Sequence, residues 1–123
     1  MTASLAFVTP PPGLAPHVDF SLAPVDGAEG LFALRAVHDE GLRLYLVDPQ
    51  SVVSAYAPTL SDEQVAELAL TSPDDAMVLV VAHPSSEGVS VNLLAPVVVN
   101  RRSGAAAQVI LEDQDYPLRA PLG

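Results

Sequence analysis

The chain of 123 residues contains no cysteine, no tryptophan and no lysine, and aromatic residues make up only 5% of it. The absence of cysteine excludes disulfide bonds, thiolate metal sites and cysteine nucleophiles. Because aromatic side chains are few, the core must consist mainly of valine, leucine and alanine. No apolar run approaches the ~20 residues of a membrane-spanning helix, and the N-terminal segment has neither the basic nor the long apolar part of an export signal. We therefore expect a cytoplasmic protein that does not cross a membrane.

Positive charge is also scarce, because the chain has 5 basic residues, all of them arginines, and 15 acidic ones. The formal net charge of −10 at pH 7 repels phosphate groups, so direct binding to nucleic acids or anionic membranes is disfavoured. The same charge favours encounter with a basic protein partner. Charge alone leaves open the alternative that the acidity only keeps the protein soluble.

Short apolar segments recur along the chain, separated by turn residues. Half of the residues are hydrophobic, and the 12 prolines and 7 glycines favour short strands joined by tight turns. Alternation is clear where Leu42, Leu44 and Leu46 share one face of a strand. We therefore expect one domain over residues 1–123 with an all-β fold, a small antiparallel barrel or sandwich. The expected strands are 4–8, 18–23, 30–37, 42–47, 77–83, 89–94, 97–100 and 106–111.

One segment, SDEQVAELAL at residues 61–70, has helical rather than strand periodicity. Ser61 followed three residues later by Gln64 forms the pattern of a capping box. Val65, Leu68 and Ala69 have the spacing of one buried helix face. The sequence predicts a helix of about ten residues that ends before Ser72–Pro73 and covers an open end of the barrel.

Candidate catalytic and metal-binding residues are sparse. His17, His38 and His83 each lie in or beside a turn, and we expect three separate surface histidines rather than a metal site. The acidic segment EDQD at 112–115 could supply paired carboxylates, but its first two residues would point to opposite faces of a strand end. No phosphate-binding glycine loop or hydrolase motif is present. We expect a protein that is not an enzyme and has no cofactor or metal.

The stretch VNLLAPVVVN at residues 91–100 is strand-like but contains a proline, which cannot donate to a strand ladder. Pro96 predicts a bulge or bend at which the chain turns a corner of the barrel. Asn92 and Asn100 flank this bend and could either satisfy backbone groups left unpaired there or contact a partner.

Together with QVIL at 108–111 and DYPLRAPL at 115–122, this stretch resembles the C-terminal half of the FliW family of flagellar assembly factors. The blocks PPGL (11–14), LFALRAV (31–37), LRLYLVDP (42–49) and LSDEQVAELAL (60–70) are similar to the upstream blocks of that family. Two features depart from the family pattern. Asp48 stands where an asparagine is usual, and the chain starts almost at the segment matching LAFVTPPPGL, where family members carry an additional strand. We therefore expect a barrel that is one strand short or closed differently.

The resemblance implies a pseudobarrel of two small packed sheets with one short capping helix. It also implies that the protein, a monomer when free, binds flagellin in the cytoplasm and, once flagellin is exported, binds the translational regulator CsrA, so that flagellin synthesis resumes. Because CsrA is a basic RNA-binding protein, we hypothesise that the docked acidic surface raises the cost of bringing RNA close to it. Two alternatives stay open: a flagellin chaperone without CsrA control, and a small ligand-binding or enzymatic barrel. The candidate partner contacts are Asn92, Pro96, Asn100, Arg101, Gln108 and Tyr116.

Overall fold

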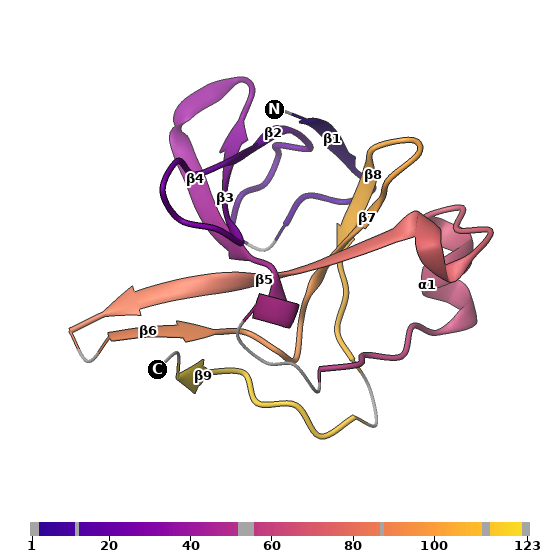
Figure 1. The fold of residues 1–123 in the computed structure, drawn as a ribbon. Coiled ribbons are helices and arrows are strands. Elements are labelled where there is room, and N and C mark those ends of the chain that lie inside the picture. The colour runs from indigo at the N-terminus through magenta and orange to yellow at the C-terminus, as the bar shows by residue number, and fades with distance from the viewer. Residues whose placement is uncertain (1–2, 12, 52–55, 87, 112–113, 122–123) are drawn as a thin grey trace.

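Strands dominate the computed structural model, which describes residues 3–11, 13–51, 56–86, 88–111 and 114–121 (Figure 1). The strands are β1 (Ala3–Phe7), β2 (Asp19–Pro24), β3 (Leu31–Ala36), β4 (Asp39–Val47), β5 (Ala76–Ser85), β6 (Gly88–Val91), β7 (Val97–Asn100), β8 (Ala105–Gln108) and β9 (Ala120–Pro121). The helical elements in this part of the chain are η1 (Pro49–Ser51), α1 (Asp62–Glu67) and η2 (Pro73–Asp75). The mainly β fold with one short α-helix is confirmed.

The strands form one continuous sheet that closes on itself. Its order is β4-β3-β2-β1-β8-β7-β5-β6-β9, and an additional pairing of β5 with β4 completes the ring. Strands β5 and β6 continue beyond the ring as a hairpin that projects to the left in Figure 1, with β9 beside β6. All pairs are antiparallel except β1 with β8, which are parallel. The antiparallel barrel that the sequence predicts therefore has one parallel seam, where β1, from the start of the chain, meets β8.

Apolar side chains fill the inside of the ring. This cluster includes the aromatic pair Phe7 and Phe20, whose rings meet edge to face at 5.3 Å. Leu46 is fully buried in it, and Leu42 and Leu44 pack against it, so the alternation predicted for this strand is confirmed. Leucine and valine supply most of the largest fully buried side chains, as expected from the scarcity of aromatic residues.

A second apolar cluster covers the outer face of the barrel wall. Val80, Val98 and Ala107 supply it from β5, β7 and β8 because successive side chains of a strand point to opposite faces. Leu68, from the end of α1, and Tyr56 cover this cluster. The helix thus packs beside the wall, at the right of Figure 1, and contributes no residue to the interior cluster.

The beginning of α1 follows the predicted capping box. The Ser61 hydroxyl accepts a hydrogen bond from the Gln64 amide at 3.1 Å, and the Gln64 side chain accepts one from the Ser61 amide at 2.9 Å. The helix ends earlier than predicted, at Glu67, because Ala69 adopts a left-handed conformation with φ of 52°. The Leu70 amide then donates back to the Val65 carbonyl at 3.0 Å, which closes the helix end.

Replacement of the residue at this left-handed position is expected to stabilise the protein. Ala69→Gly should raise the free energy of unfolding by about 1 kcal/mol, because glycine adopts positive φ without the clash that a Cβ atom causes. Ala69 is exposed, so little packing is lost. Denaturant unfolding of the two proteins measures the difference. Ala66→Gly, in the regular part of the same helix, should destabilise by a similar amount, and stabilisation by both variants would contradict the explanation.

Candidate protein-binding surface

Asn92 organises the bend between β6 and β7. Its side-chain oxygen accepts hydrogen bonds from the amides of Leu94 and Ala95 at 3.1 and 3.0 Å, while its own amide donates to the Val81 carbonyl at 2.9 Å. The side chain is buried, with 7% of the residue exposed. The Asn92 side chain therefore bonds two backbone amides at the point where the chain leaves β6 and strand pairing ends.

Asn100 has a corresponding role at the other end of the stretch 91–100. Its side-chain nitrogen donates to the carbonyl oxygen of Leu68 at 2.8 Å and to that of Ala69 at 3.4 Å. Its side-chain oxygen accepts from the amides of Arg102 and Ser103, in the turn between β7 and β8. One buried amide thus joins the turn to the two residues that follow α1 and satisfies their carbonyl groups at the helix end.

Pro96 lies directly before β7, and its side chain is fully buried. The missing N–H costs no ladder bond, whereas its carbonyl still accepts from the Val109 amide at 3.0 Å. Gln108 strengthens the same junction, because its side chain donates to the Ala95 carbonyl at 3.0 Å. The predicted break in strand pairing is present, since residues 92–96 lie between β6 and β7.

Tyr116 holds the C-terminal segment against the region after η1. Its ring meets Tyr56 edge to face at 4.7 Å, and its hydroxyl accepts from the Ala57 amide at 3.3 Å. Gln114 and Thr59 exchange two hydrogen bonds of 2.8 Å. The buried Tyr56 hydroxyl donates to the Leu93 carbonyl at 2.7 Å, and burial, together with Tyr116, raises the pKa of Tyr56 above the ordinary tyrosine value. Sequence reasoning missed Tyr56 and Gln114, because neither lies in a periodic segment.

Arg101 is exposed at the turn after β7, and its backbone amide donates to the Asp75 carbonyl at 2.7 Å. The neighbouring Arg102 lies 3.8 Å from the Asp75 carboxylate. The Thr71 hydroxyl donates to this carboxylate at 2.7 Å and the Thr71 amide at 3.2 Å. The hydroxyl hydrogen bond, more than the charge of Arg102, lowers the pKa of Asp75 below the ordinary aspartate value.

This lowered pKa predicts a pH-dependent contribution to stability. Because the pKa of Asp75 is lower in the folded chain than in the unfolded one, its contribution is present above the unfolded value and is lost as the pH falls through the folded value. Asp75→Asn should therefore reduce the free energy of unfolding at neutral pH, and the difference from wild type should shrink below about pH 4. Denaturant unfolding across this range tests the sign. The exposed neighbour provides the control, since Asp74→Asn should change stability little; a constant difference for Asp75→Asn would contradict the expectation.

An open groove of about 750 Å³ separates α1 from the end of β8. Its lining residues from the described part of the chain include three acids and no base: Asp62, Glu63 and Glu67. Gln108 and Ile110 line the opposite wall. No motif could predict this groove, because its walls come from separate parts of the sequence.

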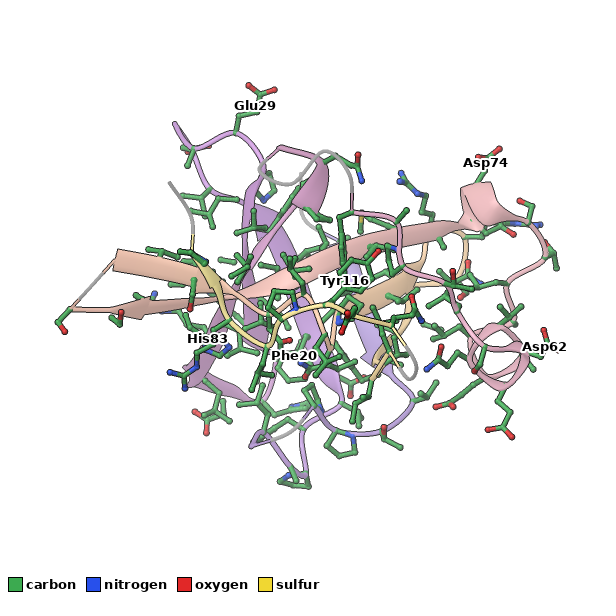
Figure 2. All side chains as sticks on the ribbon, turned by 90° about the horizontal axis from the view of Figure 1, so that it is seen from below. Phe20, Glu29, Asp62, Asp74, His83 and Tyr116 are labelled. Atoms are coloured by element: carbon green, nitrogen blue, oxygen red, sulfur yellow. The ribbon has the colours of Figure 1, made fainter. Side chains whose placement is uncertain are left out.

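The three histidines do not converge. His38 lies 3.8 Å from Asp19 at the surface, and His17 is half-buried in a turn. His83 is exposed on β5 (Figure 2). Of the acidic segment 112–115, the first two residues lie outside the described part, and Asp115 is exposed. Within the described ranges, no group of three or more metal-ligating side chains is assembled. No helix in those ranges is long and apolar enough to cross a membrane.

Comparison with known proteins gives consistent matches. The sequence model of the family described as "FliW protein" matches residues 2–122. The flagellar assembly factor FliW of Desulfitobacterium hafniense is 32% identical over 113 residues, which cover 90% of this chain and 74% of that protein. The corresponding factor of Clostridium kluyveri is 26% identical over 113 residues, covering 90% of this chain and 78% of the relative. A crystal structure of the flagellar assembly factor FliW superposes with a TM-score of 0.90 at 25% identity, covering 98% of this chain and 85% of that one.

Proposed function

The chain belongs to the FliW protein family, and from this premise we propose that it binds flagellin in the cytoplasm and, when free of flagellin, binds a CsrA-type translational regulator. Binding of the regulator relieves repression of flagellin synthesis, so the protein couples synthesis to export without catalysing a reaction. The match over nearly the whole chain to flagellar assembly factors is the observation that supports this function.

The charge of the protein supports a basic second partner. A net charge of −10 attracts a regulator with a basic RNA-binding surface and increases the rate of encounter. Once bound, the acidic surface raises the electrostatic cost of placing an RNA backbone nearby. We propose that inhibition acts through this repulsion rather than through occupation of the RNA site. Simple competition between RNA and this protein for one shared surface would contradict it.

The candidate contacts differ in how they can act. Arg101 is exposed, and Gln108 and Tyr116 are half-buried, so these three side chains can reach a partner directly. Asn92, Pro96 and Asn100 are buried and bonded internally, and we propose that they shape the surface that their neighbours present.

Light scattering of the purified protein, alone and with each partner, tests the proposal. We expect a monomer when alone, a complex with flagellin, a complex with the CsrA-type regulator, and no ternary complex when all three are mixed. Flagellin added to the regulator complex should displace the regulator. A complex with flagellin alone at moderate salt would indicate a chaperone without regulator control. Failure to bind either protein would refute the function. A ligand-binding barrel is disfavoured because apolar side chains fill the described interior.

A further inference from the structure

The backbone of residues 108–110 has one open side. Strand β8 pairs with β1 only as far as Ala106, opposite Phe7, and the Val8 amide donates to the Ala106 carbonyl at 2.9 Å. N–H groups along a strand alternate in direction, so those of Gln108 and Ile110 point to the side where β1 has ended. Within the described residues, no backbone or side-chain acceptor is bonded to either N–H group.

The opposite side of this segment is fixed. The amide of Val109 donates to the Pro96 carbonyl at 3.0 Å, and that of Leu111 to the Leu94 carbonyl at 2.9 Å. On the open side, the Gln64 side chain of α1 donates to the Ile110 carbonyl at 3.3 Å, because the N–H and C=O groups of one strand residue point to the same side. The segment is therefore held in an extended conformation, and a further strand can pair with its open edge once the Gln64 side chain releases the Ile110 carbonyl.

This edge forms one wall of the groove beside α1. The helix wall carries the carboxylates of Asp62, Glu63 and Glu67, all exposed. Near the edge, two large apolar side chains reach the surface: Ile110 is 64% exposed and Val8 is 40% exposed. The groove thus combines unpaired N–H groups, apolar side chains and negative charge, which are complementary to an extended peptide with alternating apolar and basic side chains.

We propose that an extended, basic segment of a partner protein binds in this groove and adds to the sheet as a strand beside residues 108–110. A second copy of this chain is a poor occupant, because it brings a net charge of −10 and an identical acidic wall. The inference goes beyond the proposed function and does not depend on which protein supplies the segment. A peptide test can therefore fail while binding to flagellin or to the regulator succeeds, and the reverse also holds.

The probe is an acetylated and amidated peptide of alternating lysine and valine, KVKVKVK, titrated into the ¹⁵N-labelled full chain. The amide signals of Gln108 and Ile110 should shift, and hydrogen exchange at both should slow. The corresponding glutamate peptide, EVEVEVE, should bind at least about tenfold more weakly. Affinity for the lysine peptide should fall as the salt concentration rises, since the attraction is between exposed charges.

Two sets of variants separate the contribution of the backbone N–H group to binding from that of the acidic side chains. Ile110→Pro removes an N–H group from the open edge and should weaken binding about tenfold or more, whereas Ile110→Val keeps that group and should stay within about twofold. The double variant Glu63→Gln/Glu67→Gln should weaken binding by about three- to tenfold. Asp26→Asn/Glu29→Gln makes the same change in net charge in the turn after β2 and should have little effect. Figure 2 shows Glu29 and Asp62 on different sides of the molecule.

Thermal unfolding first checks that each variant is folded, and if Ile110→Pro is not, the two charge variants decide alone. The proposal is overturned if the shifts fall on another edge such as β6, or if the groove and control charge variants weaken binding equally. Absence of binding at about millimolar peptide has the same consequence. Concentration-dependent dimers that lose Ile110 exposure would instead assign the edge to a second copy.

Discussion

Gly104→Ala is expected to lower the free energy of unfolding by about 3–5 kcal/mol, because two costs coincide at this position. Gly104 has φ of 82°, which a residue with a Cβ atom rarely adopts. In addition, a Cβ atom there would lie 2.7 Å from the backbone oxygen of Ser4, too close for any real contact. The Gly104 carbonyl also accepts from the Ala6 amide at 2.9 Å, so displacement of Gly104 disrupts the β1–β8 seam.

A control at another glycine isolates the contribution of the seam. Gly27 has φ of 81°, and apart from its two chain neighbours no heavy atom of the described residues lies within 4 Å of a Cβ atom built on it. Gly27→Ala should therefore cost only the backbone term, about 1–2 kcal/mol. Denaturant unfolding of the two variants gives the difference directly. Equal losses would mean that the contact with Ser4 relaxes freely and that the seam does not limit stability.

The second large effect is expected for Asn100→Asp, about 3–5 kcal/mol of destabilisation at neutral pH. The donor that reaches the carbonyl oxygens of Leu68 and Ala69 is replaced by a negatively charged oxygen in a buried site. The accepting oxygen, which serves Arg102 and Ser103, is retained. Because a protonated carboxyl can donate one hydrogen bond, the loss should decrease at acidic pH.

Asn92→Asp provides the matched control. The bonds of the Asn92 side chain run from the amides of Leu94 and Ala95 to its oxygen, and a carboxylate accepts such bonds equally well. This variant should lose less than about 1 kcal/mol, as measured by denaturant unfolding at the same pH as Asn100→Asp. A similar loss in both variants would show that burial of charge, rather than loss of a donor, determines the cost.

Local features of the fold followed from local patterns. The strand at Val97–Asn100 has the predicted bounds, and Ser61 begins the helix with the predicted capping box. The predicted end of the helix was wrong. The left-handed turn that ends the helix is bonded to Asn100, which lies far along the chain, so local patterns do not reveal it. β9 was missed, since two residues are too few to show alternation. The parallel pairing of β1 with β8 joins strands from distant parts of the sequence, and no periodicity reveals such a partner.

The surface was less predictable than the fold. The resemblance in the last third of the sequence indicated the family, but not which side chains face outwards. From the sequence, Asn92 and Asn100 could either bond backbone groups or contact a partner, and only the positions of their hydrogen-bonding neighbours show that both side chains are bonded internally. The groove could not be predicted, because it depends on where β1 stops relative to Gln108 and on the position of Glu63 opposite it.

The parallel seam also has a kinetic consequence. Its partners, Ala6 and Ala105, have most of the chain between them, so forming it early would require closure of a very long loop at high entropic cost. Hairpins such as β3–β4 join residues close in sequence and can form first. Ring closure is then one of the last steps of folding, and damage to the seam should accelerate unfolding while leaving the refolding rate nearly unchanged. The lifetime of the native state would thus depend strongly on the seam, whereas the folding rate would depend on it little.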